Sequence, residues 1–99
     1  FEVIMQSYNE KAGEKVAFLQ IKNYCIETFE NGQAAMSDGA YQHVALDVKD
    51  IESMYQKICN EAYPVITDGI EELPFWENGV KFFMIKGPNE ERIEFCQKL

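Results

Sequence analysis

Basic residues are scarce in this sequence of 99 residues. Nine Lys and Arg stand against 17 Asp and Glu, so the formal net charge is −8, and no cluster of Lys or Arg interrupts the acidic background. Proteins that bind nucleic acids use basic patches to neutralise phosphates. The composition therefore argues against DNA or RNA as a partner.

Long hydrophobic runs and paired cysteines are missing as well. Runs such as VKFFMI fall far short of the roughly 20 residues that span a bilayer, and no charged-then-apolar leader opens the chain. Cys25, Cys59 and Cys96 are odd in number, widely spaced and without a CxxC pair. This pattern is typical of free thiols rather than of a disulfide framework or a zinc site. We therefore expect a cytoplasmic protein that is not associated with membranes.

An internal repeat is the clearest feature that is present. The segment VAFLQIK at 16–22 matches VKFFMIK at 80–86, and CIETF at 25–29 matches RIEFC at 92–96. In the second match Ile-Glu aligns with Ile-Glu. The repeat thus predicts two neighbouring strands in each half of the chain, and the second strand of each pair carries a glutamate.

The second half of the chain predicts a complete βαβββ unit. YQHVALDV at 41–48 alternates like a half-buried strand. The segment 50–62 has apolar residues at helical spacing behind Asp50, which is suited to be the N-cap. PVITDGIEEL at 64–73 and the segment 80–86 predict two strands separated by a turn, and 92–96 predicts the last strand.

The first half shows only three strands, at 1–8, 15–21 and 23–30. We expect one domain over 1–99, in which 1–31 forms the last three strands of a first βαβββ unit and 40–99 forms the second unit. The leading strand and helix of the first unit are expected to be absent from this chain. The alternative, a fold that begins at Phe1, would leave an apolar sheet face without a covering helix. The predicted class is α+β, with a curved, cup-like mixed sheet and helices on its outer face.

Three polar residues are candidates for a metal site. Strand alternation places Glu27, His43 and Glu94 on the helix-free faces of their strands, where a curved sheet would bring them together. Carboxylates in such a cup are costly to keep charged unless a cation compensates. One imidazole and two carboxylates suit Zn, Ni, Co, Mn or Fe. The alternative is that each residue is merely solvated, but the matched positions of the two glutamates favour a site.

Four aromatic residues are candidates for substrate contact in the cup, namely Phe29, Tyr41, Trp76 and Phe83. Trp76 either covers the cup as a mobile lid or plugs the sheet edge. The same aromatic residues would also serve a metal-free binding module that holds a small flat ligand.

Three segments together resemble the vicinal oxygen chelate superfamily, also called the glyoxalase/bleomycin resistance/dioxygenase superfamily, and most closely its lactoylglutathione lyase (glyoxalase I)-like members. They are KVAFLQIKNYCIETFE, GAYQHVALDVKDIESMYQKI and VKFFMIKGPNEERIEF. The resemblance implies that Glu27, His43 and Glu94 hold one divalent metal ion, with a histidine of the absent leading strand as fourth ligand. It also implies a homodimer.

The resemblance further implies a lyase or isomerase that acts on the hemithioacetal of a 2-oxoaldehyde and a thiol. Proton transfer would pass through an enediolate held by the metal, with Glu94 as the catalytic base. A bleomycin-resistance-like binding module, a dioxygenase and an epimerase are the alternatives within the superfamily. The sequence departs from the family at Glu90, where Gly is common, and at the helix end NEAYP, where the lack of Gly leaves Asn60 or a distorted turn to end the helix.

Overall fold

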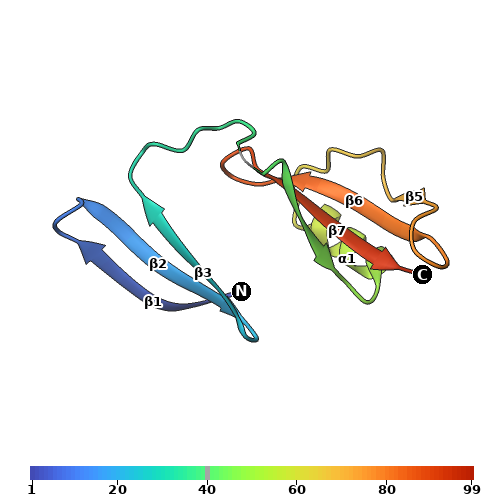
Figure 1. The fold of residues 1–99 in the computed structure, drawn as a ribbon, viewed down its shortest axis with the longest axis horizontal. Helices are drawn as coiled ribbons and strands as arrows, with labels where there is room; N and C mark the ends of the chain where they lie inside the picture. The colour runs from blue at the N-terminus through green and yellow to red at the C-terminus, as the bar shows by residue number, and fades with distance from the viewer. Residues whose placement is uncertain (40) are drawn as a thin grey trace. The chain divides into compact units, whose positions relative to one another are not determined.

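The computed structural model describes residues 1–39 and 41–99. Ala40, with which the predicted second unit begins, lies outside the described residues. The chain divides into two compact units, Phe1–Ala34 and Ala35–Leu99, each of which is described by itself (Figure 1). Among the described residues, no helix is both long enough and apolar enough to cross a membrane.

The first unit is a three-stranded antiparallel sheet. Its strands are β1 (Glu2–Asn9), β2 (Glu14–Ile21) and β3 (Tyr24–Glu30), in the order β1-β2-β3. All three predicted strands are confirmed. A bulge interrupts the β1–β2 ladder between Val3 and Met5, and Ile21 pairs with Tyr24 across a two-residue turn.

The second unit is a βαβββ unit, as predicted. It consists of β4 (His43–Asp47), α1 (Ile51–Asn60), β5 (Glu71–Leu73), β6 (Val80–Lys86) and β7 (Arg92–Lys98). The strand order is β4-β7-β6-β5 (Figure 1). Strand β4 runs parallel to β7, whereas the β7–β6 and β6–β5 pairs are antiparallel, so the sheet is mixed.

Helix α1 begins as predicted, and it ends at Asn60 in a distorted turn, which is one of the two predicted endings. The Asp50 side chain caps the N-terminus by accepting a hydrogen bond from the Ser53 backbone N–H at 3.0 Å. At the other end Ala62, and not Asn60, takes the left-handed conformation, with φ +60°. The chain thus makes the usual helix-ending turn with a residue that has a Cβ.

The core of the second unit lies between α1 and one face of β6 and β7. Ile51, Ile58, Phe83 and Ile85 are buried together. Phe83 is fully buried, and its ring stacks on Phe95 at a centroid distance of 5.2 Å. Burying a side chain of this size stabilises the fold by about 1.5–3 kcal/mol. The opposite face of the sheet is therefore the one without a helix.

The strand predicted at 64–73 is mostly wrong. Only Glu71–Leu73 forms a strand, and Val65 makes an isolated bridge with Ile85. The Thr67 side-chain oxygen accepts the hydrogen bond of the Met84 backbone N–H at 3.1 Å, which replaces a ladder bond. Gly69 then turns the chain with φ +71°. The Asp-Gly step at 68–69 was the turn signal in the sequence.

Candidate functional site

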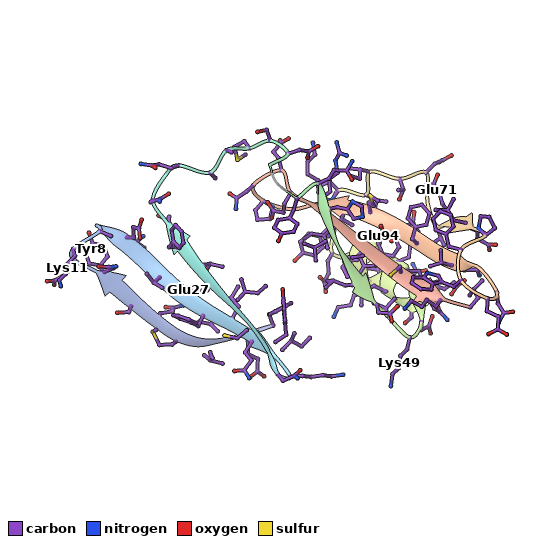
Figure 2. All side chains as sticks on the ribbon, viewed as in Figure 1. Tyr8, Lys11, Glu27, Lys49, Glu71 and Glu94 are labelled. Carbon is purple, nitrogen blue, oxygen red and sulfur yellow. The ribbon has the colours of Figure 1, made fainter. Side chains whose placement is uncertain are left out.

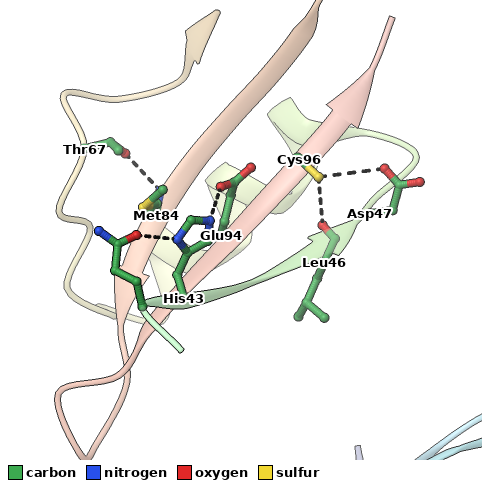
Figure 3. A network of polar contacts seen from close by, with 8 residues as sticks. His43, Leu46, Asp47, Thr67, Met84, Glu94 and Cys96 are labelled. Carbon is green, nitrogen blue, oxygen red and sulfur yellow. Dashed lines mark hydrogen bonds and ion pairs between the residues drawn. The ribbon is translucent and has the colours of Figure 1, made fainter. Parts of the chain in front are cut away.

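His43 and Glu94 meet on the helix-free face of the second unit. His43 pairs with Arg92 in the β4–β7 ladder, and Ala45 pairs with Glu94, so the two side chains are diagonal neighbours. His43 Nε2 lies 3.1 Å from Glu94 Oε2 (Figure 3). The two side chains are only 31% and 17% exposed. The predicted convergence of this pair is thus observed within one unit.

Both ring nitrogens of His43 face an oxygen atom. His43 Nδ1 lies 2.7 Å from Gln42 Oε1, and Nε2 faces the carboxylate of Glu94. A neutral imidazole carries one N–H, so one of its nitrogens offers a lone pair to an oxygen. A second ring proton, rotation of the Gln42 amide, or a cation shared between Nε2 and the carboxylate would each resolve this clash. The contact with Glu94 thus places a nitrogen and a carboxylate oxygen side by side.

Comparison with known proteins identifies the fold to which the strands of His43 and Glu94 belong. No family model matches the chain. Over 62 residues, or 63% of the chain, it is 37% identical to the uncharacterized protein YwbC of Bacillus subtilis (strain 168), and this match spans only 47% of that relative's length. A solved glyoxalase family protein from Enterococcus faecalis has a TM-score of 0.78 at 19% identity, over 97% of this chain and 77% of that one.

A second solved structure agrees with the first. The glyoxalase/bleomycin resistance protein/dioxygenase from Alicyclobacillus acidocaldarius has a TM-score of 0.66 at 12% identity, over 85% of this chain and 67% of that one. The chain has the glyoxalase/bleomycin resistance/dioxygenase fold. The predicted fold class is confirmed. Identities this low establish the fold alone, so a closer relation to glyoxalase I stays a prediction.

The His43–Glu94 pair of this glyoxalase-type fold fits two ligands of one metal ion. Two ligands about 2.1 Å from an ion are about 3.0 Å apart at a right angle and about 3.4 Å apart at the tetrahedral angle. The 3.1 Å between Nε2 and Oε2 lies in that range, and it is also the length of an ordinary hydrogen bond. Within the described residues of either unit, no group of three or more His, Cys, Asp or Glu side chains is placed to hold a metal. The second unit by itself thus brings two groups together that could bind a metal, His43 and Glu94.

Glu27 lies in the first unit, where it is exposed on β3 and pairs with Phe18 (Figure 2). Its role as third metal ligand stays a prediction. The strand pairing of the two halves is less regular than the sequence repeat suggested. Glu27 pairs with Phe18, and the repeat aligns Phe18 with Phe82. The partner of Glu94 is instead Met84, two residues after Phe82. An even shift leaves a side chain on the same face, so the expected face of Glu27 is unchanged.

The four predicted aromatic contacts have different outcomes. The prediction placed Phe83 on the wrong face: Phe82 and Met84 share the face of Glu94, and Phe83 lies in the core. Tyr41 is 82% exposed and lines a pocket that also includes His43.

Trp76 and Phe29 remain available to a ligand. Trp76 is 67% exposed in the β5–β6 connection, and Lys98 Nζ lies 4.2 Å from its ring centroid. Lys98 alternates onto the face of Glu94, so Trp76 lies toward one end of that face. Phe29 is 59% exposed in the first unit, on the same face of β3 as Glu27.

Cys96 lies near the pair but is a poor nucleophile. Its Sγ lies 3.7 Å from the Leu46 carbonyl oxygen and 3.8 Å from Asp47 Oδ1 (Figure 3). Burial raises the pKa of the Cys96 thiol, and the carboxylates of Asp47 and Glu94 raise it further. The thiol thus stays protonated and acts as a weak donor, which agrees with a packing role.

Proposed function

We propose that the chain is part of a divalent-metal-dependent, glyoxalase-like lyase or isomerase that acts on the hemithioacetal of a 2-oxoaldehyde and a thiol. The observation that carries the proposal is the contact of His43 Nε2 with Glu94 Oε2 at 3.1 Å on a half-buried, helix-free sheet face. A histidine nitrogen and a carboxylate oxygen meet there within a glyoxalase-type fold. Both groups bind divalent ions, which supports the proposal of a metal site.

The proposed ligands of the second unit are His43 and Glu94, and Glu27 of the first unit stays a predicted ligand. A divalent ion of the Zn, Ni, Co, Mn or Fe class, when bound, would polarise the oxygens of the substrate and acidify the neighbouring C–H. The Glu94 carboxylate would accept the proton from the carbon that bears sulfur and return it to the former ketone carbon. A second proton moves from the hydroxyl to the former ketone oxygen, so the product is an isomer and no oxidant is consumed. His43 would bind the same ion through Nε2, which lies 3.1 Å from Glu94 Oε2.

Glu94→Gln tests the proposal because it removes the base and keeps the size of the side chain. Turnover of the hemithioacetal of methylglyoxal is expected to fall at least about 100-fold, while the circular dichroism spectrum is retained. Glu72→Gln, an exposed carboxylate on the opposite face of β5, is the matched control and should keep activity. Undiminished turnover in Glu94→Gln would rule out the base role.

Metal content is the second test of the proposal. Elemental analysis of purified protein should find a divalent ion that His43→Ala and Glu94→Gln both lose. Turnover that persists in protein stripped of metal would contradict metal dependence. Iron dependence with oxygen uptake would instead assign the site to a dioxygenase.

A metal-free binding module is the second candidate, and one observation favours it. His43 already contacts Gln42 and Glu94, so the pair can be satisfied by hydrogen bonds with no ion. Exposed Tyr41 and Trp76 would then contact a flat ligand. A ligand-induced change of Trp76 fluorescence in metal-free protein, without turnover, would support this candidate. In either case we propose a small-molecule ligand and a homodimer.

A further inference from the structure

Three basic side chains form one row across the sheet of the second unit. His43 on β4 pairs with Arg92 on β7, and Arg92 pairs with Lys86 on β6. Paired residues point to the same face, and neighbouring strands are about 4.8 Å apart, so the three side chains leave the sheet side by side. Glu94 is on the same face, two residues along β7 from Arg92. The row therefore adjoins the His43–Glu94 contact.

This row is unusual in a chain of this composition. The chain has nine Lys and Arg and a net charge of −8. Two of these cations nevertheless stand directly opposite each other in the β6–β7 ladder, where like charges destabilise a sheet. The stability of the sheet does not require two opposed cations. A site that attracts an anion into an acidic protein does require local positive charge.

The acidic partners of Arg92 and Lys86 belong to exposed ion pairs, of which only the Lys86 pair is hydrogen-bonded. Arg92 Nη2 lies 3.6 Å from Asp38 Oδ2, and Lys86 Nζ lies 3.2 Å from Glu90 Oε2. The first separation exceeds the length of a hydrogen bond, and exposed pairs of this kind contribute little to stability. A carboxylate of a ligand can replace the Asp38 carboxylate and bind the guanidinium with both oxygens, which is the stronger geometry.

A pocket gives the ligand room at this end of the row. It has a volume of about 260 Å³, and its walls include Tyr41, His43 and Arg92 together with the carboxylates of Asp38 and Glu91. Sites for whole drug-sized ligands are larger, about 300–1,000 Å³. The pocket thus suits a short arm that ends in an anion. Tyr41 supplies an apolar wall for the stem of such an arm.

We infer that Arg92, with Lys86 beside it, is an anion subsite that binds a carboxylate of a small-molecule ligand next to the His43–Glu94 pair. In the absence of a ligand, the Asp38 carboxylate is the ion-pair partner of the Arg92 guanidinium. The ligand must displace it, so Asp38 lowers the affinity of the subsite for the ligand. The inference goes beyond the proposed reaction, because it concerns binding and applies to an enzyme and to a binding module alike.

Two probes that differ only in charge test the subsite. They are 3-(methylthio)propionate and its amide, 3-(methylthio)propionamide, titrated into the ¹⁵N-labelled full chain and followed by NMR. The propionate is expected to bind more tightly than the amide, to shift the backbone amides of Arg92 and His43, and to weaken as salt is added. Equal binding of the two probes, or no binding of either, would overturn the inference.

Substitutions of Arg92 and Asp38 are expected to change the affinity for the propionate in opposite directions, which provides a second test of the subsite. Arg92→Gln should weaken propionate binding roughly three- to tenfold, and Arg92→Lys should restore part of it, because a lysine keeps the charge but loses the two-point geometry. Asp38→Asn should tighten binding, since it removes the competing carboxylate. Lys15→Gln removes a comparable exposed ion pair, with Glu30 at 3.7 Å, and should change nothing. An unchanged affinity in both Arg92→Gln and Asp38→Asn would refute the subsite even if turnover is observed.

Discussion

Ala62→Gly should stabilise the second unit, because Ala62 ends helix α1 in the left-handed conformation with φ +60°. An L-residue in this region costs about 1–2 kcal/mol, a penalty that glycine escapes. Two hydrogen bonds form the turn, from Ala62 N–H to the Cys59 oxygen at 3.1 Å and from Tyr63 N–H to the Ile58 oxygen at 3.2 Å. Both are backbone bonds that glycine keeps. Glycine also gives the unfolded chain about 0.5–1 kcal/mol of extra entropy, so the net gain is about 0.5–1 kcal/mol.

Thermal unfolding followed at 222 nm measures this effect, because α1 is the helix that the second unit contributes to the signal. A gain of this size raises the Tm by about 2–8 °C for a chain of this length. Ala45→Gly is the control, since Ala45 lies within strand β4 and not at a left-handed position. It should lower the Tm. If Ala62→Gly lowered the Tm as Ala45→Gly does, the reasoning about the strained helix end would be refuted.

Two further predictions follow from the charged groups. Because burial raises the pKa of Cys96, iodoacetamide should alkylate it more slowly than the exposed Cys25 and Cys59. Mass spectrometry of proteolytic peptides taken at successive times would show this, and equal rates would contradict it. The hydrogen bond from Lys81 lowers the pKa of Glu52, so this pair stabilises the fold above the usual pKa of a glutamate and the effect is lost as pH falls through the lowered value. Urea unfolding should accordingly show Glu52→Gln less stable than the natural chain at pH 6 and no longer so at pH 3.

Local sequence patterns predicted the helix and most of the strands. The apolar spacing behind Asp50 located α1, and alternation located the strands that carry Glu27, His43 and Glu94. These patterns are properties of the backbone over a few residues, so no knowledge of distant contacts was needed. The same alternation put His43 and Glu94 on the helix-free face, where their side chains meet.

The errors arose where distant contacts decide the structure. Strand 64–73 failed because the Thr67 side chain took a ladder hydrogen bond of Met84. Phe83 was assigned to the wrong face because its side depends on how β6 pairs with β7. Helix α1 ends at Asn60, and the sequence did not show that Ala62 would take the left-handed conformation of the turn that follows.

The sequence by itself determined the element types and the face on which each polar side chain stands, because the period of a strand or a helix is a local property of the chain. The tertiary structure alone decided the pairing registers, and with them the 3.1 Å contact of His43 with Glu94 and the row formed by His43, Arg92 and Lys86. Register depends on turn lengths and on which face is buried, and both involve residues far apart in the sequence.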